Sequence, residues 1–160
     1  MADRRFFDAV MDAQASDAIA SASHRVTFSR GATLMRQGDF GSSMFSIISG
    51  KVMVSVHEPG GEEEVAMLGP GDFVGEMSLL TGERRSATVT ARSKVVALET
   101  PKTALAPVLA QAPHLADKLA ALVAQRHAQL AQIHKDFDRW NSVGNNPTEL
   151  AARMTAFYSG

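Results

Sequence analysis

The chain is 160 residues long, 45% hydrophobic, and has 16 basic and 17 acidic side chains, for a formal net charge of −1. This length supplies one well-buried core but not two ordinary domains, and the balanced charge gives no overall positive field for nucleic acid or an anionic membrane. The sequence has no cysteine, which excludes disulfides, thiol catalysis and cysteine-based zinc sites and fits the cytoplasm. No stretch approaches the ~20 apolar residues of a membrane span or resembles a secretory signal, so we expect one soluble domain with helical appendages.

The N-terminal segment, residues 1–21, is predicted to be helical. Over residues 3–20 its apolar side chains recur at helical spacing, and acidic residues lie near the start. Such a stripe is more often packed on its own domain than docked on a partner, which is the alternative. The stripe consists of Phe6, Phe7, Val10, Met11 and Ile19.

From Ser23 onward the hydrophobic period changes to two. Short runs rich in Val, Ile, Phe and Thr alternate with glycine-containing turns, a pattern typical of a compact antiparallel barrel or roll. Within one run, Val52, Val54 and Val56 alternate with more polar residues, so that face should point inward. The predicted strands are His24–Phe28, Ser43–Ser49, Lys51–His57, Glu64–Leu68, Ser86–Ala91 and Val95–Leu98.

Three consecutive acids, residues 62–64, follow a Pro-Gly-Gly turn. Adjacent side chains of an extended strand point to opposite faces, so three neighbours cannot all converge on one ion. We interpret the run as a solvated face rather than as a metal site.

The stretch from Phe73 to Val89 has the features of an anion site. Gly75 opens a short helical segment, and the Arg84–Arg85–Ser86 run follows its end. Free backbone N–H groups at a helix start, the helix dipole and an arginine fork all favour a phosphate. An acid at Glu76 suits a neutral sugar hydroxyl of the same ligand. The combination predicts a sugar and a phosphate in one pocket.

This segment resembles the phosphate-binding cassette of cyclic-nucleotide-binding domains, as found in bacterial catabolite activators, protein kinase A regulatory subunits and cyclic-nucleotide-gated channels. Residues 69–73 (GPGDF) are similar to the family's lead-in to the cassette, and residues 38–50 to its glycine-containing pattern. The resemblance covers residues 22–138. It implies an α+β fold: an antiparallel β-roll (jelly-roll-like barrel) with an N-terminal helix, a short cassette helix and C-terminal helices.

The resemblance also implies the ligand and its contacts. Arg85 would hold the cyclic phosphate and Glu76 the ribose 2′-hydroxyl, while Val54 would touch the base unless it is ordinary core. Cyclic AMP is the first choice of ligand and cyclic GMP the second, because guanine-selective members often have threonine where this chain has Ser86. We expect no other cofactor and no metal. The remaining cassette contacts implied are Gly75, Met77, Ser78 and Ser86.

The chain returns to helix after the last strand, with one helix predicted at residues 101–110 and another opening at Pro113. In the second helix Arg126 interrupts an apolar stripe, and a charge there needs a partner. In the bacterial channel domains that the chain resembles, an arginine at this place caps the purine; the alternative is an arginine that reaches water or pairs with an aspartate. We expect His127 and His134 to be solvated surface histidines. The stripe comprises Leu119, Val123, Arg126, Leu130, Ile133 and Phe137.

The tail, residues 139–160, is predicted to be a loop and a short helix that begins at Pro147. Leu150, Met154 and Phe157 share one side of this helix. Packing on its own domain is favoured over a partner, because a short helix is marginal unless its apolar face is covered.

Three other functions compete with nucleotide sensing. A catabolite-activator-like transcription factor would need a basic helix-turn-helix, and residues 141–160 are too short for one, so we expect no nucleic-acid partner. A hydrolase built on Glu76 with His24 or Ser78 has no base in the cassette, so we predict no enzyme. An interaction module would leave Glu76 and Arg85 unexplained. We therefore expect a regulatory sensor that acts on an effector, with a bacterial membrane channel first and a free-standing sensor of a partner protein second.

Overall fold

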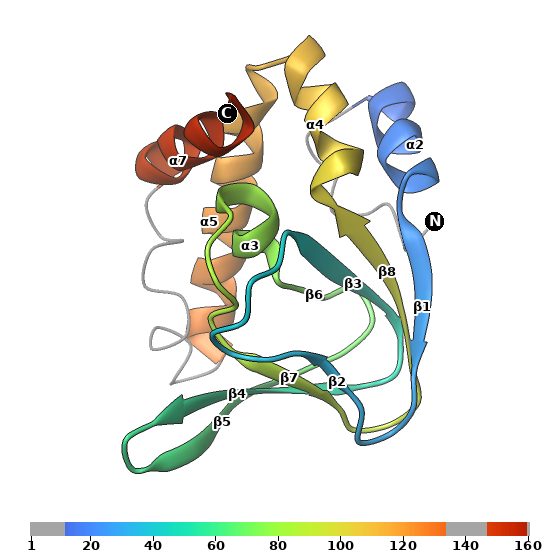
Figure 1. Ribbon diagram of the computed structural model, residues 1–160, viewed down its shortest axis with the longest axis vertical. Helices are drawn as coiled ribbons and strands as arrows, with labels where there is room; N and C mark the ends of the chain where they lie inside the picture. The colour runs from blue at the N-terminus through green and yellow to red at the C-terminus, as the bar shows by residue number, and fades with distance from the viewer. Residues whose placement is uncertain (1–11, 134–146, 160) are drawn as a thin grey trace.

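The computed structural model describes residues 12–133 and 147–159. Eight strands form two four-stranded antiparallel sheets, and helices gather at one end of the resulting roll (Figure 1). One sheet has the order β1-β8-β3-β6 and the other β2-β7-β4-β5. The predicted α+β fold with an antiparallel roll is confirmed.

The strands follow the period-two pattern closely, and two of the predicted ranges are matched to the residue. The structure adds two short strands that were not predicted, β2 and β6. Their lengths of three and two residues leave little room for an alternating pattern. The strands are β1 His24–Phe28, β2 Thr33–Met35, β3 Ser43–Ser49, β4 Val52–Glu58, β5 Gly61–Leu68, β6 Phe73–Val74, β7 Thr88–Ala91 and β8 Val95–Pro101.

The core of the roll is built from inward-facing aliphatic side chains of both sheets. The predicted inward face of β4 is confirmed, since Val52 and Val54 are 0% exposed and Val56 is 7% exposed. The alternation breaks at Ser55, which is also buried, because the β4–β5 register shifts between Val54 and Ser55. The Ser55 hydroxyl donates to the Glu62 carboxylate at 2.7 Å, which satisfies it at that bulge.

The β4–β5 hairpin carries the acidic run. Glu62 accepts a hydrogen bond from Ser55, and Glu64 forms an ion pair with Arg92 on the neighbouring part of the roll. These two acids therefore have separate protein partners. Among the described residues, no group of three or more histidine and acidic side chains is placed to hold a metal ion.

The helix α2 (Ala13–Ser21) precedes β1, with Asp12 as its N-cap accepting a hydrogen bond from the Ala15 backbone N–H at 2.8 Å. Ile19 is 1% exposed and packs into the helical core, as the predicted stripe requires. The other four stripe residues lie outside the described residues. The helix α4 (Lys102–Gln111) follows β8, and Pro101 is its N-cap rather than its first residue.

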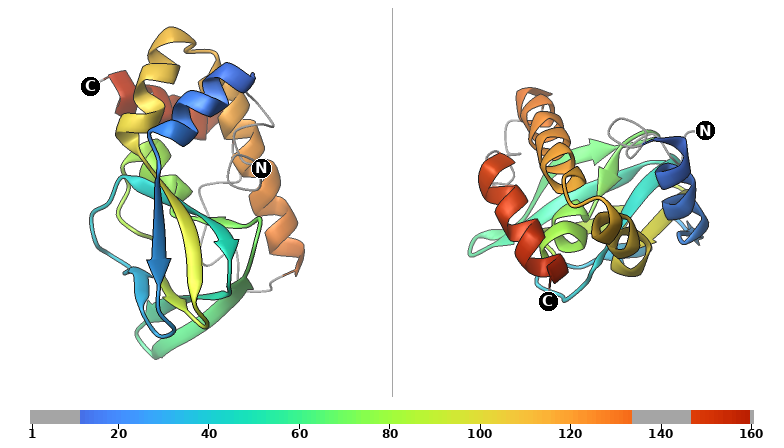
Figure 2. Two further views of the ribbon diagram at one scale, coloured as in Figure 1. Left: turned by 90° about the vertical axis from the view of Figure 1, so that its right-hand side faces the viewer. Right: turned by 90° about the horizontal axis from the view of Figure 1, so that it is seen from above.

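The helix α5 (Leu115–Ile133) begins two residues after the predicted Pro113. It runs alongside the roll, and α7 (Pro147–Ser159) lies beside it and over α3 (Glu76–Thr81) (Figure 2). Leu150 and Met154 are 0% exposed, whereas Phe157 is only partly buried. The prediction that this tail helix packs on its own domain is confirmed.

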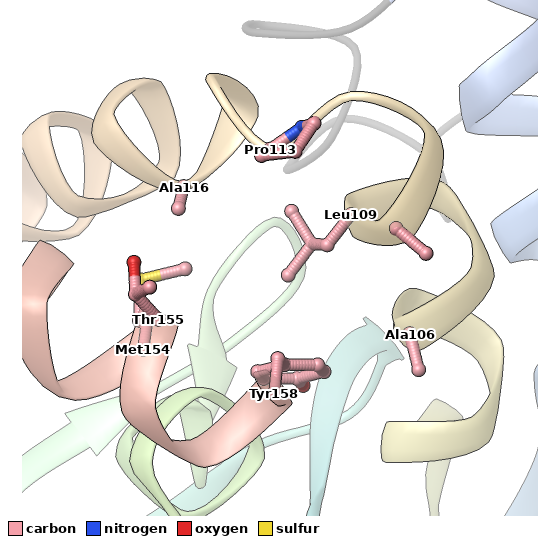
Figure 3. Close-up of a pocket in the computed structure, with 8 residues that line it drawn as sticks. Ala106, Leu109, Pro113, Ala116, Met154, Thr155 and Tyr158 are labelled. Atoms are coloured by element: carbon pink, nitrogen blue, oxygen red, sulfur yellow. The ribbon is translucent and has the colours of Figure 1, made fainter. Parts of the chain in front are cut away.

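Between α4, α5 and α7 lies a cavity of about 210 Å³ (Figure 3). Its two polar lining groups are already bonded: the Thr155 hydroxyl donates to the Ala151 carbonyl, and the Tyr158 hydroxyl to the Leu79 carbonyl. This cavity therefore offers an apolar surface and not a phosphate site. Its other lining residues are Ala106, Leu109, Ala110, Pro113, Ala116 and Met154.

Within residues 12–133 and 147–159, no helix combines the length and the apolar character that crossing a membrane requires.

Candidate functional site

The cassette forms the short helix α3, held between two left-handed glycines. Gly75 is the N-cap with φ +82°, and Gly82 is the C-cap with φ +75°, a region where other residues are strained. Glu76 is the first residue of the helix, and α3 packs against α7 and β3. The predicted start of this helix at Gly75 is therefore confirmed.

Arg85 follows α3 and points back into the roll, where it is 8% exposed. Its Nη1 donates to the Ser43 carbonyl at 2.5 Å, and its Nη2 donates to the Ser43 hydroxyl oxygen at 3.1 Å. The Ser43 hydroxyl in turn donates to the Glu99 carboxylate at 2.7 Å. Burial lowers the pKa of the Arg85 guanidinium, while the Glu99 and Glu76 carboxylates raise it. A buried cation thus lies close to the N-terminus of α3.

Two glycines make room for this cation. A Cβ at Gly41 would lie 2.5 Å from Arg85 Nε, and one at Gly75 would lie 2.7 Å from Arg85 Nη1. Neither glycine tolerates a side chain while Arg85 keeps its position.

The space beside the cassette is small. A cavity of about 10 Å³ is lined by β2, α3 and the loop after α3, whereas ligand pockets usually measure ~300–1,000 Å³. This cavity as it stands is smaller than a nucleotide. The lining residues are Met35, Gly75, Glu76, Met77, Ser78 and Ser86.

Of the predicted cassette contacts, Arg85 does not line this cavity, whereas the others lie together around it: Gly75, Glu76, Met77, Ser78 and Ser86. Met77 and Ser78 are nonetheless buried, and the Ser78 hydroxyl donates to the Glu83 carbonyl at 2.8 Å, which ties α3 to its following loop. Ser86 is half-buried. Their roles toward a ligand stay predictions.

Val54 lies elsewhere, in the middle of β4. It is 0% exposed and packs in the core of the roll, where it pairs in register with Val89 of β7. Its contact with a base stays a prediction.

The prediction that His127 is a solvated surface residue is wrong. His127 is 1% exposed, and its Nε2 lies 2.6 Å from Glu76 Oε1 in the first turn of α3. Glu76 is itself 3% exposed, so a buried carboxylate of the cassette is hydrogen-bonded to α5. His134 lies outside the described residues.

The apolar stripe of α5 therefore runs through Leu119, Val123 and His127, and the predicted place of Arg126 in it is wrong. The predicted stripe took alternating steps of four and three residues, which placed Arg126 after Val123 on the buried face. In the structure both steps, from Leu119 to Val123 and from Val123 to His127, are four residues long, so His127 takes that place. The sequence signal for this buried position was the spacing of His127, which lies four residues after Val123. The described side chains do not reach the rest of the predicted stripe, from Leu130 on.

Arg126 lies at the edge of that stripe, with a side chain 36% exposed. Its Nη2 is 3.6 Å from Asp72 Oδ1, and its guanidinium lies 5.6 Å from the centre of the Phe73 ring. The alternative of an aspartate-paired arginine is therefore observed, and the capping of a purine stays a prediction.

Comparisons with known proteins point to the same part of the chain as this geometry does. The cyclic nucleotide-binding domain family matches residues 25–112, more than half of the chain. The chain is 32% identical over 102 residues to a CRP-like cAMP-activated global transcriptional regulator of Mycobacterium tuberculosis, covering 63% of this chain and 46% of the relative. It is 36% identical over 91 residues to a cyclic nucleotide-gated potassium channel of Mesorhizobium japonicum, covering 57% of this chain and 24% of the channel.

Among solved structures, the N-terminal domain of a transcriptional regulator from Streptomyces coelicolor A3(2) is 32% identical. The match covers 83% of this chain and 94% of that domain, with a TM-score of 0.68. The chain spans less than half the length of the two curated relatives named above. The matched residues include the whole cassette, α3 and Arg85. This chain belongs to the cyclic nucleotide-binding domain family.

Proposed function

We propose that this chain is a regulatory sensor that reversibly binds a cyclic purine mononucleotide, cyclic AMP first and cyclic GMP second. The phosphate would lie against Arg85, the backbone N–H groups near Gly75, Met77 and Ser86, and the Ser86 hydroxyl. The ribose 2′-hydroxyl would donate to Glu76, and Val54 and Arg126 would contact the base.

The observation that carries this proposal is that a buried Arg85 and a buried Glu76 lie beside the same short helix. Burying a cation is costly, and Arg85 is kept at 8% exposure with the Glu99 and Glu76 carboxylates nearby but without a direct ion pair to either among the described residues, so an anion that reaches its guanidinium directly would bind favourably. A carboxylate in the same place would repel the phosphate unless it accepts from a neutral hydroxyl. A sugar phosphate satisfies both groups at once.

The signal would leave the site through α5. The helix α5 contacts the cassette through Glu76 and the lead-in through Asp72. A ligand that changes these contacts changes the free energy of the α5 position, which is the requirement for a switch.

For the location of this sensor we propose the cytoplasm. The first choice of effector is a bacterial membrane channel, with the sensor on its cytoplasmic side. Similarity to the Mesorhizobium japonicum channel supports that choice. Similarity to transcriptional regulators, whose Streptomyces coelicolor domain matches over 94% of its length, supports a second candidate in which the sensor controls a regulator of transcription.

The test is calorimetric titration of the wild type and of Arg85→Ala with cyclic AMP and cyclic GMP. Removing a buried charge partner of the phosphate should weaken binding by ~2–5 kcal/mol, a factor of roughly thirty to several thousand. Circular dichroism checks that the variant folds.

Arg84→Ala is the matched control. Arg84 is the adjacent arginine, but it is exposed, donates to the Gly38 carbonyl and lies 4.0 Å from the Phe40 ring centre, away from Ser43. The Arg84→Ala variant should bind nucleotide as tightly as the wild type does. A folded wild type that binds neither nucleotide at millimolar concentration would make the chain a degenerate interaction module, and the sensor proposal would fail.

A further inference from the structure

The helix α5 reaches the cassette at one buried polar contact. His127 Nε2 lies 2.6 Å from Glu76 Oε1, with the two side chains 1% and 4% exposed. Other side chains of α5, such as Leu119 and Val123, make apolar contacts with the core that holds α3, and the half-exposed Arg126 reaches Asp72 and the Phe73 ring at the edge of that core. The His127–Glu76 hydrogen bond therefore fixes how Glu76 is oriented relative to α5.

A carboxylate has two oxygens, each able to accept more than one hydrogen bond. With Oε1 of Glu76 held by His127, Oε2 is left for a second donor. An imidazole with its proton on Nε2 donates to Oε1 whether the ring is neutral or charged. In metal sites, a residue that hydrogen-bonds to a metal ligand sets the orientation of that ligand and its strength as an acceptor. His127 stands in the same relation to Glu76.

The entrance to the cassette lies elsewhere. The cavity beside Glu76 is lined by Met35 of β2, by α3 and by Ser86, and no residue of α5 lines it. The walls formed by Met35 of β2 and by Ser86 can open without breaking the His127–Glu76 hydrogen bond, because neither residue takes part in it. A ribose and His127 can therefore share the same carboxylate.

We propose that His127 is a positioning residue for ribose recognition: it aims Glu76 at the 2′-hydroxyl and makes that recognition depend on the docked position of α5. This inference rests on the proposed function. By linkage, if docked α5 strengthens the hydroxyl contact, the hydroxyl strengthens the docking of α5 by the same factor. The ribose and not only the phosphate then carries the signal.

The test compares cyclic AMP with 2′-deoxy cyclic AMP in the wild type, His127→Gln and His127→Phe. A hydrogen bond to a charged group makes the wild type prefer cyclic AMP by a factor of roughly ten to a hundred. His127→Gln keeps an N–H donor of similar reach and should keep most of this preference. His127→Phe keeps the ring shape without the donor, and its preference should fall close to one.

The ratio of the two affinities separates positioning from a structural role. If His127→Phe weakens both nucleotides equally and the ratio is unchanged, His127 serves the packing of α5 alone and the inference is overturned. If the wild type binds neither nucleotide, the proposed function itself fails, and the inference fails with it.

A second measurement covers the case in which His127→Phe does not fold. In the wild type, the imidazole ¹⁵N resonances of His127, assigned by their loss in His127→Gln, should shift more with cyclic AMP than with 2′-deoxy cyclic AMP. Equal shifts with both ligands would overturn the inference without any destabilised variant.

Discussion

At the scale of single residues, the position of Arg85 depends on two neighbouring glycines that have no side chain. Gly41 lies against its Nε side and Gly75 against Nη1, while Ser43 accepts two of its hydrogen bonds. The guanidinium is thus fitted into a slot whose walls are backbone. A single methyl group in that slot must displace it.

Gly41→Ala should therefore weaken cyclic AMP binding about tenfold or more while the fold survives, because a Cβ 2.5 Å from Arg85 Nε forces the arginine off its Ser43 contacts. Titration calorimetry measures the loss. The matched control is Gly60→Ala: nothing lies within 4 Å of its added Cβ, and binding should not change. Equal affinities in both variants would mean that the position of Arg85 is not limiting.

The sequence predicted some features of the candidate site and not others. The glycine caps of α3 and the pairing of Glu76 with Arg85 in one place follow from local spacing. The contact of His127 with Glu76 joins residues 51 apart, and its prediction requires the rotation of α5 about its axis to within a fraction of one residue step. Local pattern does not supply that rotation.

At the scale of elements, α7 is attached to the cassette by Tyr158. Its hydroxyl donates to the Leu79 carbonyl of α3 at 2.6 Å, and burial raises its pKa above the ordinary value of 10. The neutral phenol is therefore the form that the docked helix needs. Docking of α7 becomes sensitive to the ionisation of this one group.

Tyr158→Phe should lower the free energy of unfolding at neutral pH by about 0.5–1.5 kcal/mol, because the Leu79 carbonyl loses a donor. Thermal or urea unfolding at pH 7 measures this change. An unchanged stability would mean that water replaces the hydroxyl at no cost.

The same hydroxyl gives a pH dependence. Because the folded-state pKa is raised, its contribution is fully present below pH 10 and is lost as pH rises from there toward the folded-state pKa. Tyr158 is the only tyrosine, so tyrosinate absorbance follows it alone. We expect its ionisation to coincide with alkaline unfolding, and Tyr158→Phe to lose stability less steeply over that range; ionisation near pH 10 without unfolding would contradict this.

Among the elements, the helices and longer strands were predictable because each repeats its period several times. The strands β2 and β6 were not, since each contributes its hydrogen bonds to a distant partner, β7 and β3 respectively. Pairing across the roll, rather than local pattern, makes these residues extended.

At the scale of the molecule, α5 is the element whose position a nucleotide should change. The absence of cysteine allows two spin labels without background, at Thr27→Cys on β1 and Ala128→Cys on α5, both exposed. We expect the distance distribution between the labels to shift with cyclic AMP, and to stay fixed in an Arg85→Ala background. Identical distributions with and without nucleotide in the otherwise wild-type protein would show that α5 does not transmit binding.

The fold class followed from the change of hydrophobic period, first to two and then back to helical spacing. The order of strands within each sheet did not, because period-two segments carry no label for their partners. Strand β8 shows this best, since it lies between β1 and β3, which precede it by many residues.

That central place of β8 has a consequence for how the chain reaches its native state. The strand β1 pairs with β8 from His24↔Glu99 onward, so during synthesis on the ribosome it waits for about 70 further residues before its partner emerges. The β4–β5 hairpin, in contrast, can close as soon as Leu68 is made. Loop closure over such a span slows folding, which places this roll among the domains that fold in milliseconds to seconds. The cassette is synthesised before β8, so the sheet β1-β8-β3-β6, which holds Ser43 opposite Pro101, can close only after Arg85 has been made.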